Sequence, residues 1–214
     1  MASPRIKGNT VKARLDFART HGGEALIEKL KEEPGPAGEL ARMPLITVRE
    51  FPIADVEALS VAIARELGGG PELYEKMGVH SADLNRMLQK IVHRGNTDPH
   101  QILAGIVREF PMFVVGDIGR IVYEPDPQED VGRIIWAGHE ETGLSHCLSS
   151  IGYTVRVLNN WGVKGAAGAN IECMATGGSR CVWEFRWREA TGKLRNTSQI
   201  RGDALAERIR KYTA

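Results

Sequence analysis

The chain has 214 residues, with 28 Lys and Arg against 27 Asp and Glu, so its formal net charge is +1. This length fits one domain with a substantial core, and the balanced charge excludes the concentrated basic surface that nucleic-acid binding needs. No uncharged stretch could span a bilayer and no secretory signal is evident, so we expect a cytoplasmic protein. Three cysteines do not form the disulfide framework of a secreted protein, so we expect them to be thiols or metal ligands.

Helical patterns dominate the first half of the chain. Asn9 can cap a first helix, and a glycine pair at positions 22 and 23 separates it from a second one. An apolar stripe over residues 56–67 ends at three glycines, and Pro71 opens a short helix after them. We expect a helical part over about residues 8–112.

The clearest amphipathic pattern lies near the middle of the chain. Its apolar residues recur at helical spacing and are Leu84, Met87, Leu88, Ile91 and Val92. This face can belong to the core, or it can be a surface that pairs with another protein. A further helix begins after the Asp98 cap, with Pro99 in its first turn, and ends at Pro111.

The pattern changes after Gly116. Residues 120–124 and 132–137 read as two short strands of a hairpin, a helix follows over about residues 142–158, and a second hairpin comes next. We expect this sheet-rich part to span about residues 116–190, with a last helix over about residues 203–212. The order predicts a single α+β domain with a helical layer on an antiparallel sheet.

The second hairpin carries a strict alternation. Every second residue from Cys181 is large and apolar or sulfur-bearing, with Trp183, Phe185 and Trp187 following it. This period of two is typical of a strand with one buried face. The hairpin therefore has an aromatic inner wall.

Turn geometry predicts the register of this hairpin. A three-residue loop over residues 176–178, with glycine in the left-handed position, puts Cys173 opposite Cys181 and Ile171 opposite Trp183. It sends Asn170, Glu172 and Met174 to the other side. A two-residue loop would instead split the two cysteines between the faces.

The third cysteine lies on the helix before this hairpin. Packing of that helix on the inner face of the sheet brings Cys147 toward Cys173 and Cys181. Three converging sulfurs can bind zinc, which prefers thiolate and imidazole ligands. They can equally be small buried apolar side chains. The scattered histidines, His93 among them, read as surface or cap residues.

The aromatic wall offers a second candidate site. Trp183 and Phe185 of the hairpin, with Leu148 and Ile151 of the preceding helix, can line an apolar pocket between helix and sheet. The same side chains can instead fill the core. Phosphate-loop, dinucleotide-binding, nucleophile-elbow and zinc-protease motifs are all missing, so no catalytic residue is assigned and no enzyme is expected. The acidic cluster at residues 139–141 reads as a helix cap.

The region from Thr142 to Trp187, with its helix cysteine, glycine turn and Cys-Val-Trp-Glu-Phe strand, resembles the 4-vinyl reductase-type sensor domains. Their superfamily also holds heme-nitric-oxide-binding domains and the TRAPP vesicle-tethering subunits. The N-terminal part, from Ile6 to Leu30 and from Phe51 to Gly68, resembles a related uncharacterised bacterial single-domain family. The resemblance covers nearly the whole chain.

The resemblance implies a fold and a function. It implies helices over an antiparallel sheet in a domain that is usually a homodimer, binds a small apolar or aromatic molecule and signals through a separate partner. Members with zinc hold it with cysteines that match Cys147, Cys173 and Cys181. Their fourth ligand is a glutamate, where this chain has Asn170. The Tyr-x-Ser-x-Arg motif of the heme branch is absent, so heme is not expected.

These observations favour a ligand-binding sensory or regulatory domain, with a structural zinc implied by the resemblance. The alternative is a non-catalytic interaction scaffold with a closed core, like the TRAPP subunits. Such a scaffold would dimerise through the face of this chain that runs from Leu84 to Val92. A reductase accessory, suggested by the family name, ranks third because no acid, base or nucleophile can be named for it.

Overall fold

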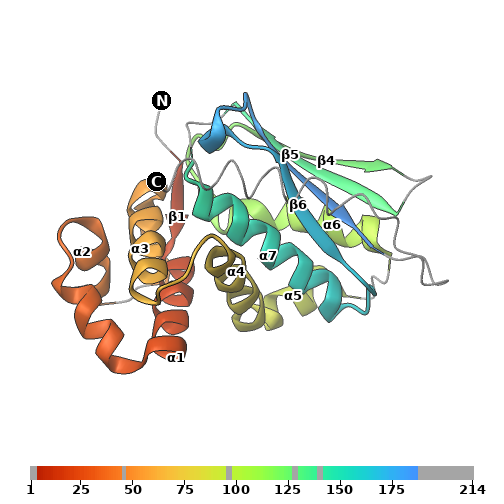
Figure 1. The fold of residues 1–214 in the computed structure, drawn as a ribbon. Helices are drawn as coiled ribbons and strands as arrows, with labels where there is room; N and C mark the ends of the chain where they lie inside the picture. The colour runs from red at the N-terminus through yellow and green to blue at the C-terminus, as the bar shows by residue number, and fades with distance from the viewer. Residues whose placement is uncertain (1–3, 45–46, 95–97, 127–129, 139–141, 188–214) are drawn as a thin grey trace.

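A computed structural model describes residues 4–44, 47–94, 98–126, 130–138 and 142–187. Helices form one side of the molecule and an antiparallel sheet the other, with α6 and α7 against the sheet (Figure 1). This arrangement confirms the predicted α+β class. The predicted helix over residues 203–212 and the acidic cluster at 139–141 lie outside the described residues. Among the described helices, none combines the length and the apolar character needed to cross a bilayer.

The N-terminal helices form a layer of their own. Their bounds are Gly8–Glu32 for α1, Pro36–Arg42 for α2 and Ile53–Glu66 for α3. Helix α1 bends at Gly23, whose φ of 70° is the left-handed conformation that glycine adopts without strain. The glycine pair therefore marks a bend between two helical pieces, near the predicted boundary.

A small sheet, which the sequence did not predict, ties the N-terminus to the middle of the chain. Strand β1 (Arg5–Lys7) lies between β2 (Glu50–Pro52) and β3 (Val114–Val115), antiparallel to both. Two- and three-residue strands are too short for a periodic pattern, so only the pairing reveals them.

Two helices far apart in sequence pack most closely. They are α4 (Glu72–Leu84) and α7 (Leu144–Asn160), which lie next to each other in Figure 1. Gly78 of α4 lies against the backbone of α7, and Gly152 of α7 lies against the backbone of α4. Glycine at both contacts lets the two helix backbones approach, because a Cβ atom would overlap the facing carbonyl.

The helix predicted around residues 84–92 is broken in two. Helix α4 ends at Leu84, and the short α5 (Arg86–Val92) follows after Asn85. The apolar side chains Met87 and Ile91 of α5 do not belong to the core, because they are 72% and 74% exposed. The pattern is amphipathic, but tertiary packing leaves these side chains in solvent.

Helix α6 (Pro99–Glu109) begins as the sequence predicted. The Asp98 side chain accepts a hydrogen bond from the His100 backbone N–H at 2.9 Å, and Pro99 occupies the first turn. A 3₁₀ turn, Phe110–Met112, follows and leads into β3.

The main sheet has four antiparallel strands in the order β4-β5-β7-β6. Their bounds are Arg120–Asp126 for β4, Val131–Ala137 for β5, Ala167–Glu172 for β6 and Cys181–Arg186 for β7. Both predicted hairpins are therefore present. Strand β7 is central and buried on both faces, where one exposed face was expected.

The register of the second hairpin differs from the predicted one. Asn170 faces Trp183, and Glu172 faces Val182, because a β-bulge interrupts the pairing between Asn170 and Glu172. The prediction that Ile171 faces Trp183 is therefore wrong, as is the outward placement of Asn170, which is buried. The loop also differs, since a 3₁₀ turn over Met174–Thr176 precedes Gly177.

Candidate functional site

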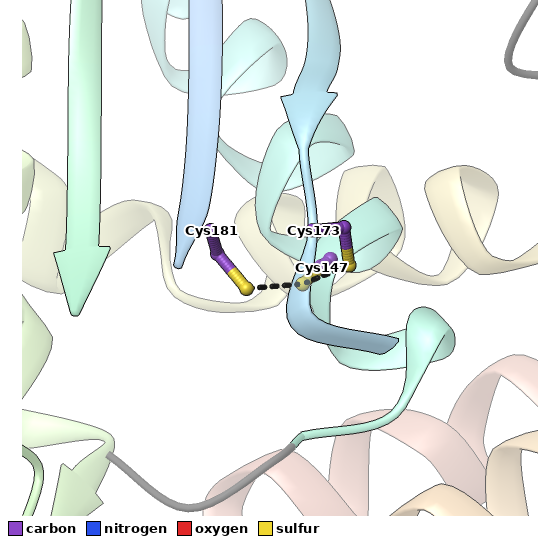
Figure 2. A group of neighbouring side chains, drawn as sticks. All are labelled: Cys147, Cys173 and Cys181. Carbon is purple, nitrogen blue, oxygen red and sulfur yellow. Dashed lines mark hydrogen bonds between the residues drawn. The ribbon is translucent and has the colours of Figure 1, made fainter. Parts of the chain in front are cut away.

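The three cysteines converge. All three are buried, and their sulfur atoms lie within 4.8 Å of one another. The Cys147 sulfur is 3.5 Å from each of the other two. Figure 2 shows Cys147 reaching from helix α7 between Cys181, at the start of β7, and Cys173, just after β6. The predicted convergence of these side chains is found in the structure.

The cluster has the spacing of a thiolate metal site. Tetrahedral zinc with Zn–S bonds of about 2.3 Å places its sulfur ligands about 3.8 Å apart. Contacts with the Cys147 and Cys181 sulfurs lower the pKa of Cys173, while contacts with the two other sulfurs, together with burial, raise the pKa of Cys147. One thiolate among the three is thus already favoured, and deprotonated sulfur is the form that binds metal.

The two candidates for a fourth ligand lie on opposite sides. Glu172 points away from the cysteines, and its carboxylate accepts hydrogen bonds from Ser179 at 2.9 Å and Arg180 at 3.1 Å. Asn170 is turned inward by the bulge, and its carboxamide lies against the Cys173 thiol. Asn170, where the resembling family has a glutamate, is therefore the buried one of the two candidates, but its side chain carries no charge.

A cavity of about 80 Å³ lies where the helical layer meets the sheet. It is bounded by α1, α4, α6, α7, the small sheet and one residue of β7. Its apolar wall consists of Ile6, Ile106, Phe110, Phe113, Val114 and Trp183. The Trp183 indole Nε1 is buried and has no acceptor among the described residues.

The cavity wall also contains a buried cation. Arg14 on α1 is only 4% exposed, and its guanidinium donates to the Ser60 hydroxyl at 3.1 Å and the Ser149 hydroxyl at 2.7 Å. Burial lowers the pKa of Arg14 to about 10, and the charge of Glu57 partly opposes this shift. At neutral pH the Arg14 guanidinium in the cavity wall therefore carries a positive charge.

An acidic group lies on another wall of the cavity. Glu109 at the end of α6 is 1% exposed, and its Oε1 lies 3.1 Å from Nε2 of the buried His93. The Tyr153 hydroxyl is 3.4 Å from its Oε2. Burial, together with the Glu109 charge, raises the pKa of Tyr153. His93 is therefore a core residue paired with a carboxylate, and its assignment to the surface was wrong.

One of the four predicted pocket residues lines this cavity. Trp183 does so, whereas Leu148, Ile151 and Phe185 are buried in the core outside its wall. Sequence reasoning missed Arg14 and the pair that Glu109 forms with His93. A signal existed in Gly105, because a Cβ atom there would lie 2.6 Å from the His93 ring. A glycine inside a helix often marks such a close approach.

Comparisons with known proteins identify the fold. No protein-family model matches the chain, and no curated protein matches it either. Among solved structures, an H-NOX protein from S. oneidensis in the Fe(II)NO ligation state has a TM-score of 0.68 at 13% identity, covering 86% of this chain and 100% of its own.

Two further H-NOX structures agree. A variant of the T. tengcongensis protein has a TM-score of 0.64 at 10% identity, covering 86% of this chain and 98% of its own. An oxygen-binding H-NOX domain related to soluble guanylate cyclases gives 0.60 at 11% identity, covering 90% of this chain and 100% of its own. The chain therefore has the fold of these H-NOX structures.

The expectation about heme needs correction. It rested on an absent motif, yet the structures of the same fold are described in Fe(II) ligation states. The missing motif does not remove heme from the candidate cofactors of this fold. The cavity of about 80 Å³ is smaller than the roughly 300–1,000 Å³ of pockets for larger ligands, so heme would need the surrounding helices to separate.

Proposed function

We propose that this chain is a small-molecule sensory domain of the 4-vinyl reductase type, whose ligand enters the cavity between helices and sheet. The observation that carries this proposal is the cavity itself. Its wall combines aromatic side chains with the buried cation Arg14 and the buried acid Glu109, which lies next to His93. Ligand sites in proteins are concave and mostly apolar, with a few placed polar groups.

The position of the cavity suggests how binding would be signalled. Its wall joins residues of α1, α4 and α7 with Trp183 of β7, so a ligand would touch the helical layer and the sheet together. A ligand that binds only one relative placement of these layers shifts the population toward it. A partner that contacts the helices could then detect the change.

A thermal-shift screen with small apolar, aromatic and polar compounds tests this proposal. A ligand that binds only the folded state raises the melting temperature by an amount that grows with the logarithm of its concentration over Kd. The substitution Ile106→Phe fills part of the cavity and should abolish the shift. The same change at exposed Ile91 is the matched control and should leave it intact. A ligand whose shift survives Ile106→Phe binds elsewhere, and this would refute the proposal.

We further propose that Cys147, Cys173 and Cys181 bind one structural zinc ion. The bound ion would link α7 to both strands of the second hairpin and would stabilise the fold. The short distances between the three sulfur atoms support this assignment. Asn170, water or a partner would complete the coordination.

Elemental analysis of protein purified without chelators tests the zinc site. About one zinc per chain is expected in the unmodified protein, and much less in Cys173→Ser. The variant Glu172→Gln is the matched control, because this neighbouring carboxylate points away from the sulfurs. Metal-free wild-type protein, or loss of zinc in the control, would contradict the assignment.

A second function, homodimerisation or partner binding through α5, is supported by the exposed apolar side chains Leu84, Met87 and Ile91. Exposed apolar groups that cluster on a surface often mark interaction sites. Sedimentation of the wild type should reveal a dimer that Met87→Glu dissociates. Val61→Glu, at another partly exposed apolar position, is the control. A wild-type monomer would refute dimerisation through this surface.

A further inference from the structure

Arg14 is a buried cation that has no carboxylate as an ion-pair partner among the described residues. Its two hydrogen-bond acceptors are the neutral hydroxyls of Ser60 and Ser149. Among the residues that the structure describes, no carboxylate forms an ion pair with it. A buried charge without a counterion is costly, and proteins normally supply a partner.

The acid whose charge acts on Arg14, Glu57, already has other hydrogen-bond partners. The charge of Glu57 raises the pKa of Arg14, but by less than burial lowers it. Its carboxylate accepts hydrogen bonds from the backbone N–H of Ser145 at 3.0 Å and of His146 at 3.3 Å, at the first turn of α7. Glu57 thus stabilises the positive end of that helix and does not pair directly with the guanidinium.

The acidic group in the cavity wall, Glu109, has close polar neighbours within the protein. Glu109 lies 3.1 Å from the His93 imidazole, and the Tyr153 hydroxyl is close to its second oxygen. Arg14, by contrast, lines the cavity without a carboxylate at ion-pair distance among the described residues. The Trp183 indole N–H adds a buried donor without an acceptor. Both features call for a ligand with negatively charged acceptor oxygens.

Provided that the cavity is the ligand site proposed above, we infer that its ligand is a small organic carboxylate whose charged end pairs with Arg14. The apolar end would lie against aromatic residues such as Phe110 and Trp183. The cavity of about 80 Å³ is smaller than the roughly 150 Å³ cavity that accepts benzene. Its size therefore favours a short-chain aliphatic acid over an aromatic one.

Calorimetric titration of the full chain with butyrate and with butyramide, at matched ionic strength, tests the inference. The two compounds have nearly the same shape and differ in charge. Butyrate should bind at least about tenfold more tightly, as expected for charge-assisted hydrogen bonds in a buried site. Equal or tighter binding of the amide would overturn the inference while leaving a ligand cavity in place.

A variant pair locates the charge effect. Arg14→Met should remove the preference for butyrate, while Arg5→Met, the same change at a half-exposed position, should retain it. If Arg14→Met does not fold, the comparison of the two ligands on the wild type still decides the question. A failure of every compound in the wider screen, neutral ones included, would instead refute the proposed ligand site itself.

Discussion

The contact between α4 and α7 allows a quantitative prediction. An alanine Cβ at position 78 would lie 1.9 Å from the Ser149 carbonyl oxygen and 2.8 Å from the Tyr153 backbone nitrogen. These obstacles are backbone atoms, so no side chain can rotate away. The two helices would have to separate by roughly an ångström or more to restore normal contact.

We expect Gly78→Ala to lower the free energy of unfolding by about 2 kcal/mol. Overpacking of this kind costs about 1–3 kcal/mol, and the rigid obstacle points to the upper end. The better helix propensity of alanine returns about 1 kcal/mol. For a chain of this size the loss corresponds to a melting temperature about 4–8 °C lower.

Urea denaturation followed by circular dichroism is the assay. Lys76→Ala, on the exposed side of the same helix, is the control and should change stability by less than about 0.5 kcal/mol. Gly152→Ala should be similarly harmful, because its Cβ would lie 2.1 Å from the Glu75 carbonyl oxygen. The double variant should cost less than the sum of the two, since one separation relieves both overlaps. A Gly78→Ala protein as stable as the wild type would refute the close packing.

Three further predictions concern single side chains. Burial alone would raise the pKa of Glu184, but hydrogen bonds from Arg186 and Arg133 hold this pKa below its usual value. The ionised carboxylate therefore stabilises the fold above about pH 4, and this stabilisation is lost as the pH falls through the lowered folded-state pKa. Glu184→Gln should therefore cost about 1–3 kcal/mol at neutral pH and less in acid, and a pH-independent difference in urea denaturation would contradict this. Asn170→Glu should tighten zinc binding in competition with a chelator, because it adds a carboxylate beside the cysteines; unchanged affinity would place the fourth ligand elsewhere. Glu57→Gln should destabilise the protein by about 1 kcal/mol, because it weakens the contacts of the Glu57 carboxylate with the first turn of α7. Thermal unfolding measures this loss, and an unchanged melting temperature would contradict it.

The local periodicity of the sequence was sufficient to predict much of the architecture. Alternation along β7 and helical spacing along α7 identified the elements that carry the cysteines, and both hairpins follow from turn residues and strand patterns. These features depend on neighbouring residues, so they can be read from the chain itself. The convergence of Cys147 with the hairpin cysteines followed from them.

Other features depend on contacts between distant segments. The bulge that turns Asn170 inward shifts the register by one residue, and no local signal fixed its position. The exposure of Met87 also contradicts its periodic pattern, because burial depends on what packs against a face and not on the face alone.

The sequence by itself determined the main helices, the two hairpins, the fold class and the convergence of three sulfurs, because backbone preference and side-chain period act over a few residues. Only the tertiary structure revealed the cavity and its charges. Arg14, Glu109 and Trp183 come from three separate parts of the chain and line one cavity only after folding. A pocket is the space that packing leaves between distant surfaces, and neither its volume nor its charge can be read from any one segment.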